Sequence, residues 1–102
     1  MNEVQLKMYM NEKILICIPA RLNSFRLPEK PLLKINGKSI IQHVYEKALQ
    51  INYNKDIVIL TDDIKIKNVV DTFALNKCHI INEECLNGSD RIIKYLKKKK
   101  YK

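Results

Sequence analysis

Residues 13–44 read KILICIPARLNSFRLPEKPLLKINGKSIIQHV, and this stretch decides the fold. It begins with a continuous run rich in β-branched residues, 13–19, which is typical of a strand buried on both faces of a parallel sheet. It ends in apolar residues at helical spacing, and the loop between them holds the last two of the three prolines of the chain. The stretch therefore predicts a strand, a long stiff loop and a helix.

The same alternation of strand and helix repeats twice in the remaining sequence. The expected strands cover residues 13–19, 56–60 and 78–81, and the helices that follow them cover residues 39–51, 64–75 and 89–100. This order predicts an α/β fold with a parallel sheet and right-handed crossovers. Ligands of such sheets bind beyond the carboxyl ends of the strands.

Polar residues mark the start of each expected helix. Ser39 and Gln42 form an S-x-x-Q capping box before the first helix. Asp62 or Asp63 can cap the second helix, and Ser89 can cap the third. Because adjacent carboxylates after a strand are mostly caps, we expect no metal site at Asp62 and Asp63.

Length and composition bound the class of protein. With 102 residues and 46% apolar content, the chain is a single small globular domain. The longest uncharged apolar run, residues 14–20, is too short to span a bilayer, and residues 1–12 lack the features of a secretory signal. We therefore expect an N-terminal extension over 1–12, a nucleotide-binding part over 13–102, and a cytoplasmic location. The three cysteines show no C-x-x-C spacing, which favours neither a disulfide framework nor a zinc site.

Two common phosphate-binding motifs are excluded, one by spacing and the other by the number of glycines. The sequence GKS at 37–39 resembles the end of a P-loop, but the first glycine of that motif is missing and the strand ends far upstream. With only Gly37 and Gly88 in the chain, no G-x-G-x-x-G exists. Gly37 is instead predicted to be the turn glycine of an Asn-Gly pair.

The arginines are concentrated at two strand-end loops. Lysine outnumbers arginine 16 to 3, yet Arg21, Arg26 and Arg91 all follow the first or third expected strand. Arginine presents a planar fork of donors that matches phosphate, so this placement predicts an anion site, with Lys30 as a further cation. Salt bridges to some of the 11 acidic residues are the alternative.

The first loop and its flanks carry a resemblance to a known family. IPARLNSFRLPEKPLLKINGKSIIQHV resembles the N-terminal signature of 3-deoxy-manno-octulosonate cytidylyltransferases, also called CMP-Kdo synthetases. TDD at 61–63 and NGSDRI at 87–92 resemble the T-D and G-T-E-R segments of that family at matching spacings. The resemblance implies a Rossmann-like three-layer sandwich of the nucleotide-diphospho-sugar transferase type, truncated to about three β-α units with spatial strand order third, second, first.

The resemblance also implies an activity and its residues. The sugar-acid hydroxyl would attack the α-phosphate of CTP, releasing pyrophosphate and forming CMP-Kdo for lipopolysaccharide biosynthesis, with Mg²⁺ as cofactor. Arg21 and Lys30 are the implied catalytic residues. The implied nucleotide-binding residues are Ala20, Arg21, Ser24, Arg26 and Lys30 around the triphosphate, and Gly88, Ser89 and Arg91 near the cytosine and ribose.

The sequence departs from the family pattern in several places. Phe25, Glu29 and Ser39 replace a frequent threonine, glycine and proline, and Glu29 adds negative charge beside the predicted anion site. The metal-binding aspartate of the family lies in a Q-G-D-E-P segment that this sequence lacks. We therefore expect a truncated or split N-terminal half, and assign no metal-binding residue.

Other functions and partners stay open at this stage. The chain could be a non-catalytic nucleotide-binding remnant or a split subunit, or a cytidylyltransferase for another sugar acid. A nucleic-acid binder using the lysine-rich residues 94–102 is disfavoured, because no aromatic interleaving or docking motif accompanies the charge. The first strand is expected to be an open edge, which favours a homo-oligomer or association with a missing C-terminal half. His43 and His79 are interpreted as structural.

Overall fold

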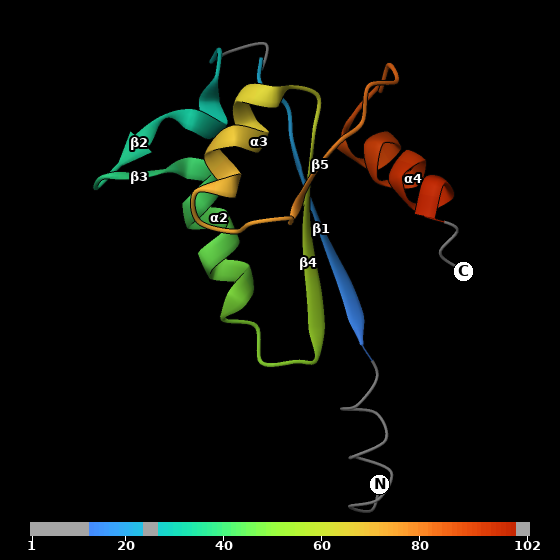
Figure 1. Ribbon diagram of the computed structural model, residues 1–102, viewed down its shortest axis with the longest axis horizontal. Helices are drawn as coiled ribbons and strands as arrows, with labels where there is room; N and C mark the ends of the chain where they lie inside the picture. Colours follow the sequence, from blue (N-terminus) through green and yellow to red (C-terminus); the bar gives the residue numbers. More distant parts are fainter. Residues whose placement is uncertain (1–12, 24–26, 100–102) are drawn as a thin grey trace, which may run out of the picture.

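A three-stranded parallel sheet forms the centre of the computed structural model, which describes residues 13–23 and 27–99 (Figure 1). The strands lie in the order β1 (Ile14–Ala20), β4 (Lys55–Thr61) and β5 (Cys78–Ile80), and all pairs are parallel. The predicted strand order is therefore confirmed. Each strand begins or ends within one residue of its predicted bounds.

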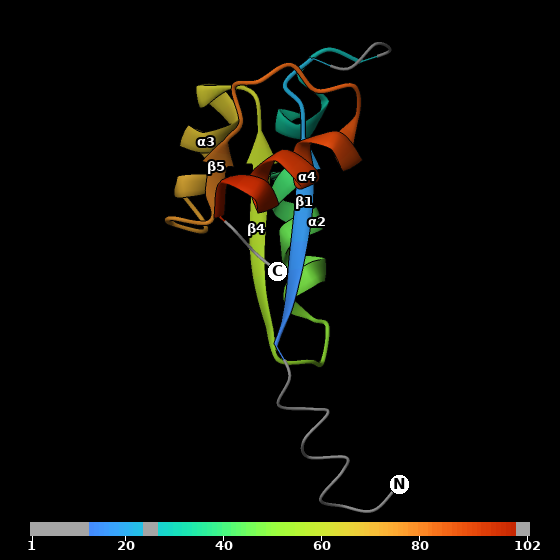
Figure 2. The ribbon, with the colours of Figure 1, turned by 90° about the vertical axis from the view of Figure 1, so that its right-hand side faces the viewer.

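Helices cover both faces of this sheet. α2 (Ile40–Leu49) and α3 (Ile64–Asp71) lie on one face, and α4 (Gly88–Lys99) crosses the other (Figures 1 and 2). Alternate residues of β4 point to opposite cores: Ile57 and Ile59 pack toward α2 and α3, whereas Val58 and Leu60 pack toward α4. The three-layer α/β sandwich that the family resemblance implies is confirmed.

The central strand is more deeply buried than its neighbour β1. Ile59 and Leu60 of β4 have no exposed surface, and burying a side chain of this size contributes about 1.5–3 kcal/mol. Residues 15–18 of β1 are only partly buried. Within the part of the chain that the structure describes, β1 pairs with β4 alone, so its other side is an open edge. Association through this edge stays a prediction, and the extension over 1–12 lies outside the described residues.

Side-chain caps fix the start of each helix, and one of them differs from expectation. Ser39 Oγ accepts a hydrogen bond from Gln42 N at 3.2 Å, so the Ser39 half of the predicted S-x-x-Q capping box is confirmed. The side-chain amide of Gln42 donates from Nε2 to Glu46 Oε2, on the next turn of α2, at 3.2 Å. The expected Ser89 cap of α4 is wrong, because Asn87 Oδ1 accepts from Asp90 N at 2.9 Å and the helix begins at Gly88. Asparagine is as good an N-cap as serine, and its carbonyl oxygen here reaches the third helical amide.

Two helices end earlier than their apolar pattern suggests. α2 ends at Leu49 and α3 at Asp71, instead of residues 51 and 75. After α3 the chain tightens, since Phe73 N donates to Val70 O at 3.0 Å, three residues back. β-Branched and aromatic residues such as Thr72 and Phe73 favour helix less, so a packed turn replaces the last helical turn.

The loop after β1 contains short regular elements that the sequence analysis did not predict. It holds a 3₁₀ helix, η1 (Lys30–Leu32), and a small hairpin of β2 (Lys34–Ile35) and β3 (Lys38–Ser39). Asn36 and Gly37 connect the hairpin with φ of 53° and 79°, the left-handed pair that a two-residue turn requires. The turn role predicted for Gly37 is confirmed. Among residues 13–23 and 27–99, every helix is too short or too polar to cross a lipid bilayer.

Candidate functional site

A pocket of about 380 Å³ opens at the carboxyl end of β1. Four segments meet there: the end of β1, η1, the first turns of α2 and the first residue of α4. The lining residues are Ile18, Pro19, Ala20, Arg21, Lys30, Pro31, Ile40, Ile41, Val44 and Gly88. Four of the predicted site residues, Ala20, Arg21, Lys30 and Gly88, are thus brought together at the edge of the sheet where parallel α/β folds bind ligands.

Two cations line a pocket whose remaining surface is largely apolar. Arg21 directly follows β1 and Lys30 begins η1, and both side chains are exposed. Within residues 13–23 and 27–99, neither side chain forms an ion pair with a carboxylate. The alternative, that Arg21 serves to form a salt bridge, therefore finds no support among the described residues. Both cations are available to an anionic ligand.

The start of α4 closes the pocket from the other face of the sheet. Gly88, the first residue of α4, lies against Pro19 of β1. Backbone amides at the first turn of a helix lack intrahelical partners and carry partial positive charge, which favours anions. Ser89, a predicted nucleotide-binding residue, follows Gly88 and is exposed. It does not line the pocket itself.

Arg91 is placed differently from the other predicted site residues. Its residue exposure is 3%, and its Nη1 donates to the Ile81 carbonyl at 3.0 Å. Its Nε is buried and has no hydrogen-bond partner within the described residues. In this chain Arg91 therefore joins α4 to the segment that follows β5. Its nucleotide-binding role stays a prediction.

The remaining two predicted residues, Ser24 and Arg26, lie outside the described residues. The base of their loop is described: Asn23 and Pro28 form an isolated antiparallel bridge. Glu29, beside this base, has a left-handed φ of 55°, a conformation that costs a non-glycine residue roughly 1 kcal/mol or more. Its carboxylate pairs with Lys65 of α3 at 3.5 Å. The negative charge of Glu29, which would oppose anion binding, is thus paired with the positive charge of Lys65.

The adjacent carboxylates Asp62 and Asp63 have separate structural partners. Asp62 Oδ1 accepts a hydrogen bond from Leu22 N at 3.0 Å, and Asp63 Oδ1 accepts from Lys65 N at 2.8 Å. Asp63 is the N-cap of α3, as one of the two predicted alternatives has it. No group of three His, Cys, Asp or Glu side chains suited to a metal ion occurs in the described part of the chain. Because Asp62 and Asp63 each accept a hydrogen bond from a backbone amide, neither is assigned as a Mg²⁺ ligand among the described residues.

The link between Asp62 and Leu22 is a feature of the site that sequence analysis missed. It joins two positions 40 residues apart, one after β4 and one after β1. The available signal was the predicted pairing of the first two strands, because parallel neighbours end at the same edge of a sheet. A polar residue directly after one strand can therefore meet the loop that leaves the other.

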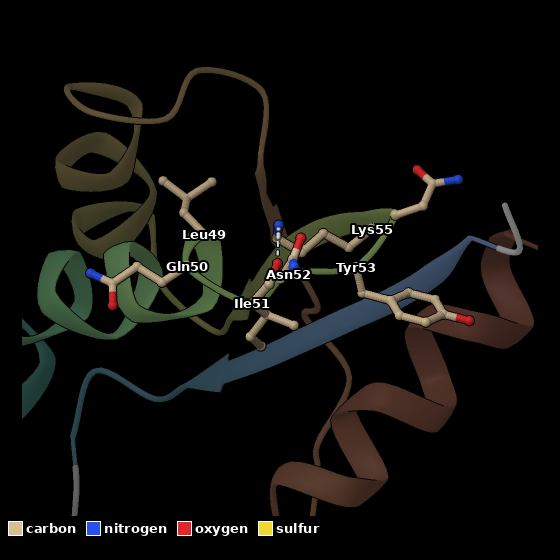
Figure 3. A pocket seen from close by; sticks show the side chains of 7 residues that line it. Leu49, Gln50, Ile51, Asn52, Tyr53 and Lys55 are labelled. Carbon is tan, nitrogen blue, oxygen red and sulfur yellow. Dashed lines mark hydrogen bonds between the residues drawn. The ribbon is translucent and has the colours of Figure 1, made fainter. Parts of the chain in front are cut away.

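A second hollow, of about 440 Å³, lies at the opposite end of the sheet (Figure 3). Residues 49–55, which are the loop between α2 and β4 and the two residues that flank it, line it entirely. Lys55 Nζ closes this loop by donating to the Ile51 carbonyl at 2.7 Å. None of the predicted site residues lies there. The hollow is the larger of the two, but it lies at the amino ends of the strands, away from the ligand-binding edge of this fold.

Both histidines and the buried Cys78 contact or pack against neighbouring groups of the fold. His43 Nε2 is 2.7 Å from the Ile35 carbonyl, and the His79 ring lies 5.2 Å from that of Tyr95. Burial is the main cause that lowers the pKa of His79, with Lys99, Lys67 and Lys77 adding to it. Burial also raises the pKa of Cys78 to about 11, so this thiol is neutral and unreactive at neutral pH.

Comparison with known proteins identifies the class to which this fold and pocket belong. A sequence model of the family described as cytidylyltransferase matches residues 15–102. The chain belongs to the cytidylyltransferase family, which confirms the resemblance seen in the loop after β1.

Individual members of this family show which cytidylyltransferases the chain is similar to. The chain is 48% identical over 79 residues to the 8-amino-3,8-dideoxy-manno-octulosonate cytidylyltransferase of Shewanella pealeana, covering 78% of this chain and 32% of that protein. It is 42% identical over 86 residues to the 3-deoxy-manno-octulosonate cytidylyltransferase of Escherichia coli, covering 84% of this chain and 35% of that protein. The chain therefore spans about a third of the length of the curated relatives it matches.

A solved structure shares the fold as well as the sequence. CMP:2-keto-3-deoxy-manno-octonic acid synthetase complexed with CTP matches with a TM-score of 0.79 and 41% sequence identity. The match covers 85% of this chain and 36% of the other. Both the family and the α/β architecture are thereby established for these residues.

Proposed function

We propose that these residues form the CTP-binding part of an enzyme that transfers CMP from CTP to 3-deoxy-manno-octulosonate or its 8-amino analogue. The observation that carries the proposal is the pocket in which Arg21 and Lys30 meet Ala20 and Gly88 at the carboxyl end of β1. Relatives with both substrate names match at 42–48% identity, and the similar solved structure contains CTP. We place the reaction in lipopolysaccharide biosynthesis in the cytoplasm.

The proposed chemistry is a displacement at phosphorus. A hydroxyl oxygen of the sugar acid forms a bond to the α-phosphorus of CTP and releases its proton to solvent, and the bond from that phosphorus to the β-phosphate oxygen breaks to release pyrophosphate. Negative charge spreads over the phosphate oxygens during this step, so nearby cations lower the barrier. Arg21 and Lys30 are the described cations of the pocket that would do so.

Mg²⁺ is part of this proposal as the cofactor that offsets phosphate charge. Asp62 and Asp63 are hydrogen-bonded to backbone amides, so we assign the metal no ligand among the described residues. A homo-oligomer, or a complex with a protein that supplies the sugar-binding half, is proposed on the basis of the open edge of β1.

Isothermal titration with CTP tests the nucleotide-binding part of the proposal. We expect binding by the unsubstituted chain and roughly tenfold or greater weakening in Arg21→Ala, because a charge-assisted hydrogen bond contributes about 1.5–3 kcal/mol. Lys98→Ala is the matched control: it removes the same charge from an exposed position near the far end of α4, where Lys98 pairs with Glu83. Equal losses in the two variants would mean diffuse attraction instead of a site, and no CTP binding would refute the proposal.

A further inference from the structure

We propose that Asp62 is a positioning residue for the nucleotide pocket, a role that rests on the proposed function. Asp62 directly follows β4, and its Oδ1 accepts a hydrogen bond from Leu22 N at 3.0 Å. Leu22 is the second residue after β1 and the direct neighbour of Arg21. The carboxylate thus holds the backbone at the point where the chain leaves the sheet to line the pocket.

The sheet itself no longer holds this part of the backbone. The last paired residues of β1 and β4 are Ala20 and Thr61, so the ladder ends one residue before Arg21. Leu22 is 7% exposed as a residue, and its side chain packs in the core under α2 and α3. Asp62 adds an acceptor for the Leu22 amide on the same edge. Arg21 therefore lies between two fixed residues, Ala20 in the ladder and Leu22 in the core, and its backbone direction is set by both.

A carboxylate suits this task better than a neutral group. A hydrogen bond from a backbone amide to an ionised acceptor is stronger than one between neutral groups. Without that acceptor, the amide of the buried Leu22 would have to rearrange toward water. The neighbouring Asp63 carboxylate cannot take over, because it accepts from Lys65 N as the cap of α3.

A second contact crosses the same corner but is weaker. Glu29, the residue before η1, pairs with Lys65 of α3 at 3.5 Å, and both side chains are about half exposed. Exposed ion pairs of this kind contribute little. We therefore assign the positioning of Arg21 to Asp62 and expect little from Lys65.

Three variants separate positioning from general stability. Asp62→Ala removes the acceptor, Asp62→Asn keeps an oxygen acceptor without the charge, and Asp63→Ala removes the neighbouring helix cap. In titrations with CTP we expect Asp62→Ala to bind about tenfold more weakly, and Asp62→Asn to stay within about threefold of the unsubstituted chain. Asp63→Ala is expected to lower the melting temperature while leaving the affinity of the folded protein unchanged.

A double variant shows whether Asp62 acts through Arg21. If it does, Asp62→Ala weakens CTP binding little further once Arg21→Ala is present, because the effects of two residues are not additive when one acts through the other. Losses that add fully would overturn the proposal. An affinity of Asp62→Ala equal to that of the unsubstituted chain would overturn it as well.

Amide hydrogen exchange distinguishes failure of this inference from failure of the proposed function. In Asp62→Ala we expect the Leu22 amide to exchange at least about tenfold faster, whereas Ile59 in the centre of β4 keeps its protection. Faster exchange with unchanged CTP affinity would overturn positioning and leave the proposed function standing. If the unsubstituted chain binds no CTP, the proposed function fails and positioning falls with it. The exchange rate of the Leu22 amide would then still show whether Asp62 holds the backbone at Leu22.

Discussion

Gly88 lies so close to Pro19 that a Cβ atom placed on it would come within 2.9 Å of the proline Cγ. Pro19 belongs to β1 and Gly88 is the first residue of α4, so this contact sets how closely α4 approaches the sheet. Both residues line the pocket. Glycine is required at position 88 because a larger side chain would collide with Pro19, and not because of a left-handed φ. Its small size allows the start of α4 to reach the candidate site.

Gly88→Ala is expected to destabilise the fold by about 1–3 kcal/mol, because the added methyl group meets a ring that is held in a strand. Urea unfolding measures the loss. Ser89→Ala is the control: Ser89 is exposed in the same helical turn, and such surface substitutions stay within about 0.5 kcal/mol. A Gly88→Ala variant as stable as Ser89→Ala would show that α4 can move away from β1 at no cost.

Arg91→Ala is expected to lower the free energy of unfolding by about 2–4 kcal/mol, whether or not a nucleotide is bound. The guanidinium is buried and donates to the Ile81 carbonyl, so its removal leaves a cavity and an unpaired acceptor. Thermal unfolding without ligand measures this. Lys97→Ala, an exposed substitution on the same helix, is the control and should change little. Unchanged stability of Arg91→Ala would return Arg91 to a purely ligand-binding role.

Much of the fold follows from short patterns in the sequence. The run at residues 57–60 is apolar at every position because β4 is covered on both faces, and its short length between two helical patterns favoured a strand. The Asn-Gly pair at 36–37 predicted a turn because its left-handed φ values suit few other residues. The cap of α4 was assigned wrongly to Ser89, because serine and Asn87 are equally good caps and only the backbone path decides between them.

The candidate site was less accessible to sequence analysis. Residue type and chain position were enough to place Arg21 and Lys30 at one edge of the sheet, because both follow the first strand. They were not enough to place Arg91 in the interior, since a buried arginine depends on a carbonyl that tertiary packing supplies. They could not pair Asp62 with Leu22 either, because a bond across 40 residues depends on strand register.

The stability of the chain is expected to fall as the pH drops below about 6.5, in part through His79. Burial beside Tyr95 and the nearby Lys99, Lys67 and Lys77 lower the pKa of this histidine in the folded state. The unfolded state then binds more protons than the folded state, so the contribution of neutral His79 is present above pH 6.5 and lost as the pH falls through the folded pKa. Urea unfolding at pH 7.5 and pH 5.5 should show a smaller difference in His79→Gln than in the unsubstituted chain. An identical difference in both would assign the pH dependence to other groups.

The 102-residue chain alone is expected to bind CTP but to release pyrophosphate at a negligible rate when 3-deoxy-manno-octulosonate and Mg²⁺ are added. Arg21 and Lys30 supply part of the charge needed at the phosphates, but within the described residues no carboxylate group is arranged to hold the metal. Every 1.36 kcal/mol of lost transition-state stabilisation lowers the rate tenfold, and loss of metal and sugar positioning forfeits several kcal/mol each.

A pyrophosphate-release assay checks this prediction, with the E. coli 3-deoxy-manno-octulosonate cytidylyltransferase, a longer relative of which the match covers 35%, as the positive control. Robust turnover by the chain alone would contradict it, and Asp62→Asn and Asp63→Asn would then identify the ligand. Both variants keep an oxygen that can accept the amide hydrogen bonds of Leu22 and Lys65, so the fold is retained while a charged metal ligand is lost. Turnover that survives both substitutions would exclude these two carboxylates as the metal site, and turnover lost in one of them with CTP affinity retained would assign the metal to that residue.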